Sequence, residues 1–311
     1  MHRRRATARL RLLVMATPAP YVLGTGDDEL ARLGLQHQLW SDAAHTAWRL
    51  ARIGPGQSWL DVGCGPGYAS FDLAQFVTSS GHVVAVDESK PFIEFAREQA
   101  RVRGQSNLTL AVADVTRLSE CPEVHAHNLA ASAGFGSSLH SEYGGFDGAY
   151  IRWVLCFLKH PESVLRDLAK LTKKGGHVVI HDYFNYTSMT MAPRRKAFSK
   201  AVAATAESWR ERGGDPDVMA RVPAMLADAG FSVRHLNIHA RIARGSSTAQ
   251  PDSMYHWMAN WWRTYAPKLV GMGKLTQADC DELLADVDQV ERSDTDFVAC
   301  PTVYEIVAER V

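Results

Sequence analysis

The chain has 311 residues, of which 46% are hydrophobic, and its 34 Lys and Arg residues balance 34 Asp and Glu residues. A chain of this length can bury one large core with a small accessory unit. The zero formal net charge provides no field that favours nucleic acid or an anionic membrane, so we expect a small-molecule ligand. The five cysteines are odd in number and include no Cys-x-x-Cys pair, which argues against a disulfide framework and favours a reducing, cytoplasmic setting.

The N-terminal segment is basic and only briefly apolar. Its start, "MHRRRATARLRLLVMA", has too few consecutive apolar residues for a secretory signal or a membrane span. We expect residues 1–20 to form a flexible basic arm, with Met1 or Met15 as the start and an organelle presequence as the alternative. Residues 21–57 are expected to form a helical cover of one or two helices, because apolar residues recur at helical spacing from Asp27 to Ile53.

Strand-like runs alternate with helical patterns through the middle of the chain. The runs are residues 58–62, 82–87, 108–114, 146–153 and 177–183, and the alternation predicts a parallel sheet. Helical patterns over 194–212 and 217–229 follow. Residues 231–243 and 302–311 then alternate as two more strands, so the predicted core is 58–243 with 297–311.

Two segments interrupt this order. Residues 119–145 are rich in Ala, Ser and Gly with little periodicity, and we expect a surface insertion there. Residues 244–296 contain two helical patterns, the first with a dense group of aromatic residues, and are expected to form a helical cap inserted between the last two strands.

The stretch "WLDVGCGPGYAS", residues 59–70, ends an apolar strand with closely spaced glycines. Such a turn lets a ligand approach the backbone, and the first N–H groups of the following helix can donate to it. A dinucleotide fingerprint requires a third glycine at the position of Tyr68. The chain has Gly-x-Gly-x-Gly instead, with glycines 63, 65 and 67.

This turn resembles motif I of the class I S-adenosylmethionine-dependent methyltransferases, and the similarity continues in order. Asp87 ends the second strand, Asp114 ends the third, and "FDGAYIRWVLCFLKHPESVLRDLAKLTKKGGHVVIHDY" is similar to the fourth strand, the next helix and the fifth strand. The resemblance implies a Rossmann-like α/β fold whose mainly parallel seven-stranded sheet has the order 3-2-1-4-5-7-6. It also implies S-adenosylmethionine as the cofactor.

The resemblance implies roles for single residues. Asp87 would accept hydrogen bonds from the ribose hydroxyls, Asp114 would meet the adenine amino group, and Asp61 would orient the loop or reach the methionine ammonium through water. His37 is a further candidate contact, and the aromatic faces of Tyr21, Trp40 and Trp153 are candidates to meet the sulfonium cation. The whole expected cofactor set is Asp61, Gly63, Cys64, Gly65, Asp87, Glu88, Asp114, Val115, Arg152, Tyr21 and Gln36.

The acceptor end is expected beyond strands four and five, where ligands lie in doubly wound sheets. The catalytic candidates are His181, Asp182 and Arg152. An alcohol or phenol acceptor needs a base such as His181, whereas an amine acceptor needs only a hydrogen-bond partner such as Asp182. In the alternative mechanism, no side chain transfers a proton and the protein only positions the reactants. The substrate candidates are aromatic and favour an apolar or aromatic metabolite methylated on O, N or C: Trp153, Tyr183, Tyr186, Trp257 and Trp261. In the alternative, the tryptophans of the cap only dock it on the core.

No metal site is predicted. His125, His127 and His140 lack supporting carboxylates or cysteines, and His235 and His239 are about 13 Å apart along a regular strand. Two other functions share the predicted sheet, that of a nicotinamide-dependent oxidoreductase and that of a non-catalytic interaction protein. Tyr68 argues against the first and the intact acidic residues argue against the second. A second copy of the chain is a candidate partner.

Overall fold

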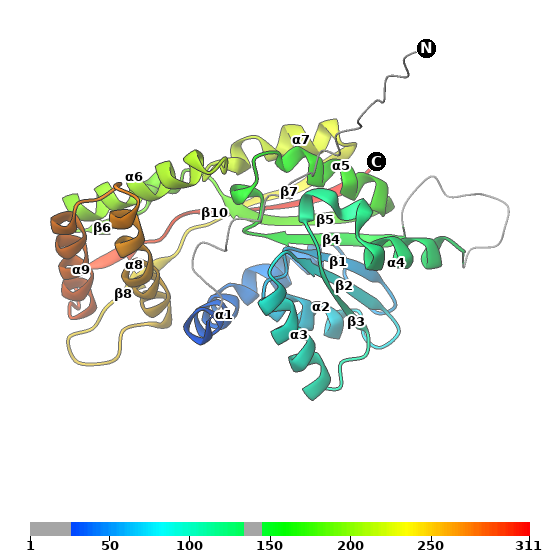
Figure 1. The fold of residues 1–311 in the computed structure, drawn as a ribbon, viewed down its shortest axis with the longest axis horizontal. Helices are drawn as coiled ribbons and strands as arrows, with labels where there is room; N and C mark the ends of the chain where they lie inside the picture. The colour runs from blue at the N-terminus through cyan, green and yellow to red at the C-terminus, as the bar shows by residue number, and fades with distance from the viewer. Residues whose placement is uncertain (1–25, 134–144) are drawn as a thin grey trace, which may run out of the picture.

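The computed structural model describes residues 26–133 and 145–311, which form an α/β core with a helical extension (Figure 1). Seven strands form the main sheet in the order β3-β2-β1-β4-β5-β10-β7, which confirms the predicted order. Within this sheet β10 alone runs opposite to the other six strands. The strands are β1 Ser58–Val62, β2 His82–Asp87, β3 Leu108–Val112, β4 Phe146–Arg152, β5 Thr172–Tyr183, β7 Phe231–His239 and β10 Val303–Arg310.

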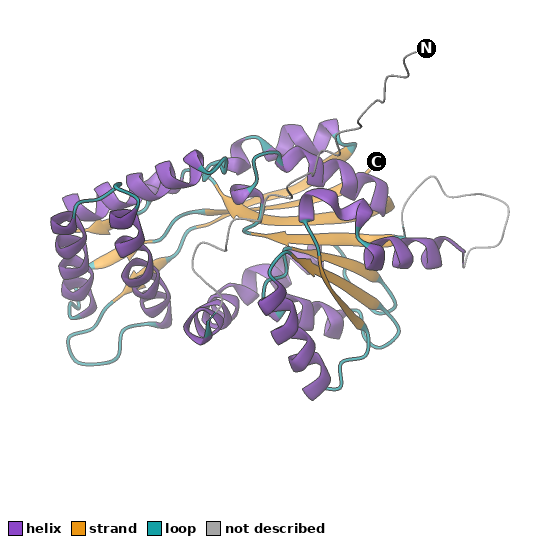
Figure 2. Cartoon of the chain, viewed as in Figure 1, coloured by secondary structure: helices purple, strands orange, loops and turns teal. Residues whose placement is uncertain are grey.

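Helices cover both faces of this sheet, as Figure 2 shows. One face carries α1 (Asp27–Leu50), α2 (Tyr68–Phe76) and α3 (Lys90–Val102). The other carries α5 (Pro161–Leu171) and α7 (Val222–Asp228). Parallel strands buried on both faces need continuous apolar sequence, and "HVVAV" in β2 provides it.

The helical cover is the single helix α1, and its sequence explains where it packs. Buried residues recur at positions 40, 43, 44, 47 and 48, which is the spacing of one helix face. Acidic residues occupy the first turn and Arg49 the last, both favourable to the helix dipole. The residues before position 26, including Tyr21 and the expected basic arm, lie outside the described residues.

The segment 119–145 contains more regular structure than its composition suggested. Pro122–Ala133 forms helix α4, which lies between β3 and β4 in the chain and contacts β2. Proline suits the first helical position, and Ala-rich sequence favours helix even without a strong apolar period. Residues 134–144 lie outside the described residues.

The cap is larger than predicted because it recruits residues from both sides of the 244–296 segment. Helices α8 (Ser253–Gly271) and α9 (Gln277–Glu291) pack on α6 (Lys196–Glu211), to the left of the main sheet in Figure 1. A small sheet of order β6-β9-β8 joins them, with β6 Thr190–Ala192, β8 Ile242–Arg244 and β9 Phe297–Ala299. The predicted strand 231–243 therefore breaks after His239, where the chain leaves the main sheet for the cap. Within the described ranges, no helix is long and apolar enough to cross a membrane.

Candidate active site

A pocket of about 820 Å³ lies at the carboxyl ends of β1, β2 and β4, beneath α1 and α8. Its volume is in the range that holds a cofactor with a small substrate. One end is formed by the glycine turn and the acidic residues after β1, β2 and β3. The other end is formed by aromatic residues from β4, β5, α6 and α8.

The glycine turn is built from left-handed backbone. Gly63, Gly65 and Gly67 have φ values of 70°, 55° and 82°, which favour glycine over residues with a Cβ. The backbone N–H groups of Gly63 and Cys64 both donate to the carbonyl of Val86, 2.8 and 2.9 Å away, which fixes the turn against β2. Gly65 faces open space, because a Cβ built there would meet no atom within 4 Å.

Asp87 joins the turn to the next helix. Its Oδ2 accepts from the backbone N–H of Gly65 and its Oδ1 from that of Ser89, each at 2.8 Å. Burial raises the pKa of this carboxyl, and the two hydrogen bonds oppose the rise. A carboxylate oxygen has more than one acceptor site, so both oxygens can still accept from a ligand.

Asp61 is the most deeply buried acid of the pocket wall. Its Oδ2 accepts from the hydroxyl of Ser70 at 2.6 Å. Burial raises the pKa of Asp61 to about 6, although Ser70 and Arg152 favour the ionised form. Arg152 lies on the same wall, over the ring of Trp153 at 5.1 Å.

Asp114 and Glu88 form the acidic rim of the pocket. Oδ1 of Asp114 accepts from the backbone N–H and the hydroxyl of Thr116, at 2.8 and 2.7 Å, and thereby caps a short helix. Burial, followed by the charges of Asp87 and Asp114, raises the pKa of Glu88. Cys64 and Val115 line the pocket beside them.

All five substrate candidates line the pocket: Trp153, Tyr183, Tyr186, Trp257 and Trp261. Helix α8 divides its tryptophans between two tasks. Trp257 and Trp261 line the pocket, whereas Trp262 is fully buried against Phe198, with ring centroids 5.2 Å apart. One face of α8 therefore docks the cap on α6, and another face presents two tryptophans to the pocket.

Gln36 connects the cap to the N-terminal helix above the pocket. Its Oε1 accepts from the indole N–H of Trp257 and from Nη1 of Arg32, both at 2.9 Å. Gln36 lines the pocket, and its side-chain oxygen holds α1 and α8 together.

Four candidates do not line the pocket. Nε2 of His37 donates to Oδ2 of Asp72 at 3.1 Å and its Nδ1 accepts from Nη2 of Arg152 at 3.2 Å, so His37 supports Arg152 from outside the pocket lining. Asp182 accepts from the backbone N–H groups of Cys156 and Tyr183 and is fully buried; burial raises its pKa to about 6. His181 bonds to Glu305 at 2.9 Å, and Trp40 packs on Trp153 from the side. The remaining cofactor candidate, Tyr21, is outside the described residues.

Several lining residues were not predicted. Five come from helices that the sequence indicated without showing which face would meet the pocket, and two from the segments after β4 and β5: Arg32, Leu33, Phe92, Trp209 and Met258, with Phe157 and Met189. Of these residues, Trp209 could have been predicted from the sequence. It is a tryptophan near the end of the helix that follows the fifth strand, and the acceptor was expected beyond that strand.

Comparison with known proteins identifies the fold and its site. A family model described as a methyltransferase domain matches residues 53–220, which is more than half of the chain. The chain belongs to the class I S-adenosylmethionine-dependent methyltransferases. A solved structure of a putative methyltransferase from Bacillus halodurans has the same fold, with a TM-score of 0.51 and 14% identity over 86% of this chain and 97% of that one.

The curated relatives of this chain carry names that describe different activities or none. An uncharacterized 37.1 kDa protein in transposon TN4556 of Streptomyces fradiae is 29% identical, over 58% of this chain and 44% of its own length. Phosphoethanolamine N-methyltransferase 1 of Arabidopsis thaliana is 29% identical, over 57% of this chain and 29% of its own length. A ubiquinone/menaquinone biosynthesis C-methyltransferase of Pseudomonas paraeruginosa is 24% identical, over 65% of this chain and 77% of its own length. The match therefore spans less than half of the first two relatives.

The pocket fits S-adenosylmethionine, the cofactor of this family. The open space beside Gly65 admits a ligand against the backbone, Asp87 has acceptor capacity for two hydroxyl groups, and Asp61 is a buried anion for an ammonium. Aromatic faces at the other end suit a sulfonium cation.

A pH dependence follows from Asp61. We expect cofactor affinity to be constant above about pH 6 and to fall by up to about tenfold per pH unit below it, because the ammonium requires the ionised carboxylate, whose pKa is raised to about 6. Calorimetric titration with S-adenosylhomocysteine from pH 5 to 8 checks this. Asp61→Asn should bind weakly with a flat profile, and a slope that survives this substitution would assign the dependence to another group.

Proposed function

We propose that this protein transfers the methyl group of S-adenosylmethionine to an O, N or C atom of a small apolar or aromatic metabolite. One observation carries the proposal: the five predicted aromatic residues lie on the wall of the pocket that also contains the glycine turn and Asp87. Bound at the glycine turn, the cofactor supplies an electrophilic methyl group. A pocket of this size has room for an acceptor against the aromatic wall.

In the proposed mechanism the chain acts mainly by positioning. Methyl transfer is an in-line displacement, so the acceptor atom, the methyl carbon and the sulfur must be held in line in a dry site. The rings of Trp153 and Tyr183 are inclined by 26° with their centroids 6.1 Å apart, and both offer aromatic surface to the acceptor. Trp257 and Trp261 on α8 cover it from the cap and exclude water.

The proposal assigns no proton transfer to His181 or Asp182, because neither lines the pocket. Asp182 instead holds the backbone after β4 through Cys156. We expect a folded Asp182→Asn variant to turn over within about tenfold of wild type, since a general base typically contributes 10²–10⁴-fold. Single-turnover rates with labelled cofactor measure this, and a loss beyond a hundredfold with unchanged cofactor affinity would restore Asp182 as a base.

The function itself is tested with labelled S-adenosylmethionine and fractionated metabolite extracts. Label should appear in small apolar or aromatic products, and S-adenosylhomocysteine should bind while NADH does not. Binding of NADH in place of S-adenosylhomocysteine would favour the oxidoreductase, and cofactor binding without labelled product from any extract would favour the interaction protein. The proposal also includes a cytoplasmic setting, which the five free cysteines support, and a ligand other than nucleic acid.

The role of the cap gives a further expectation. Trp257→Ala should raise the KM for the acceptor by about tenfold or more while leaving the affinity for S-adenosylhomocysteine within a few-fold, because it removes an aromatic face and the tie to Gln36. Trp257→Phe keeps a ring and loses only the N–H, so its KM should lie between. Steady-state kinetics measure both, and equal KM values for all three proteins would show that α8 only packs.

A further inference from the structure

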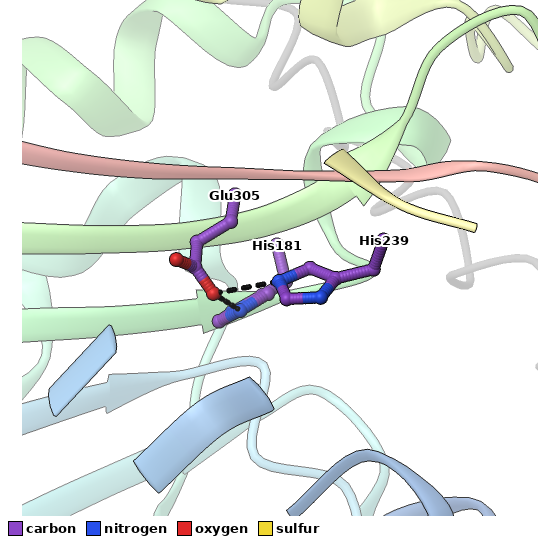
Figure 3. A group of neighbouring side chains, drawn as sticks. All are labelled: His181, His239 and Glu305. Atoms are coloured by element: carbon purple, nitrogen blue, oxygen red, sulfur yellow. Dashed lines mark hydrogen bonds and ion pairs between the residues drawn. The ribbon is translucent and has the colours of Figure 1, made fainter. Parts of the chain in front are cut away.

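A buried cluster behind the pocket unites three histidines around one carboxylate. Glu305 on β10 is fully buried, and its Oε2 lies 2.9 Å from Nε2 of His181 on β5 and 2.8 Å from Nε2 of His239 on β7. Figure 3 shows both imidazole rings converging on this single oxygen. Oε1 lies 3.0 Å from Nε2 of His235.

The strand register explains how residues far apart in the sequence meet. Glu305 pairs with His181 across β5 and with Asn237 across β7. His235 and His239 therefore flank Glu305 diagonally on one face of the sheet, two positions to either side of Asn237. His235 and His239 are too far apart along the strand to bind one ion together. Each nevertheless reaches Glu305, because the carboxylate lies between them and offers one oxygen to each.

The charge balance of this cluster is unusual. The side chain of Glu305 is only 1% exposed, so its carboxyl group is shielded from water. Among the described residues, only histidines bond to this group, and no Lys or Arg side chain does. Buried charges are normally paired or bound to a metal.

We propose that His181, His239 and Glu305 form a site for a divalent transition metal ion of the zinc type. Two imidazoles and one carboxylate are a donor set that zinc uses, and imidazole selects against magnesium and calcium. Tetrahedral zinc places neighbouring ligand atoms about 3.3 Å apart. The three ligand atoms lie within 4.8 Å of one another, so small side-chain rotations around an ion would bring them to that spacing.

The same geometry assigns His235 and the position of the ion. His235 holds Oε1 and thereby aims Oε2 at the ion, the role of a residue that orients a ligand. His239 has 18% of its side chain exposed, which gives the ion a path from solvent. The ion would tie β5, β7 and β10 together where the chain leaves the sheet for the cap at His239 and returns at Val303. The site lies next to the pocket residue Tyr150, whose ring centroid is 5.8 Å from that of His181.

Metal analysis of the full chain tests this site. Chain stripped with a chelator, loaded with Zn²⁺ and dialysed should retain about one zinc ion, and competition with a chromophoric chelator gives its affinity. His239→Ala and Glu305→Gln should each weaken that affinity by at least about a hundredfold, and His235→Ala by about 10–100-fold. The matched control is His125→Ala, which removes an exposed histidine on α4 and should bind zinc as wild type does.

A second measurement keeps the test valid if a variant fails to fold. Wild-type chain loaded with Co²⁺ should show the ligand-field bands of a tetrahedral site, and X-ray absorption of the zinc form should find two imidazole ligands. Wild-type chain that retains no more zinc than His239→Ala, or cobalt bands that are absent, would overturn the site and leave a hydrogen-bonded cluster. Either outcome is independent of methyl transfer.

Discussion

Replacement of Asp87 by alanine is expected to weaken binding of S-adenosylmethionine and S-adenosylhomocysteine by about a hundredfold or more. Hydrogen bonds to a charged group contribute about 1.5–3 kcal/mol each, and Asp87 has acceptor capacity for two ribose hydroxyls. The same carboxylate holds Gly65 and Ser89 through their backbone N–H groups, so its loss also loosens the turn. Isothermal calorimetry of the folded variant measures the combined effect.

A matched control separates ligand binding from loss of structure. Asp147 is also half-buried and also accepts a backbone N–H, from Ser58 at 2.8 Å, but it lies outside the pocket lining. Asp147→Ala should lower thermal stability by an amount similar to Asp87→Ala and leave cofactor affinity within a few-fold. Equal affinities for Asp87→Ala and wild type would remove Asp87 from the cofactor site.

The sheet and the cofactor end were predictable because they depend on short-range patterns. Apolar runs that end in glycine or aspartate fix both the strand and the edge at which its side chains emerge, so Gly65 and Asp87 could be placed before any coordinates. The order of the last two strands needed the resemblance to a known family, since antiparallel edge strands separated by a long insertion leave no local signal.

The acceptor end was less predictable because it depends on side-chain direction at strand ends. All five aromatic candidates line the pocket, but His181 points to Glu305, a residue 124 positions away whose pairing is set by the register of β10. The bonds of Asp182 to two backbone N–H groups likewise follow from how the chain turns after β4, which spacing does not encode. Helix faces were also hidden: Trp209 and Arg32 meet the pocket because of how α6 and α1 pack.

Two glycines of the same turn are expected to respond differently to alanine. A Cβ at Gly63 would lie 2.3 Å from Cγ2 of Val154, so Gly63→Ala combines overpacking of about 1–3 kcal/mol with the cost of a left-handed backbone, about 1–2 kcal/mol. It should lower the free energy of unfolding by about 2–5 kcal/mol. A Cβ at Gly65 meets nothing within 4 Å and projects into the pocket. Gly65→Ala should therefore cost only the backbone term in stability, but weaken cofactor binding by about 10–100-fold through overpacking against the ligand.

Gly104 supplies the control for backbone strain, because it has a φ of 64°, meets nothing within 4 Å and ends α3 away from the pocket. Gly104→Ala should match Gly65→Ala in denaturant unfolding and match wild type in affinity for S-adenosylhomocysteine. The comparison isolates the one methyl group that occupies ligand space, since the strain is common to both variants. If Gly65→Ala bound the cofactor as tightly as Gly104→Ala, the ligand would not approach the turn at Gly65, and the open space there would need another explanation.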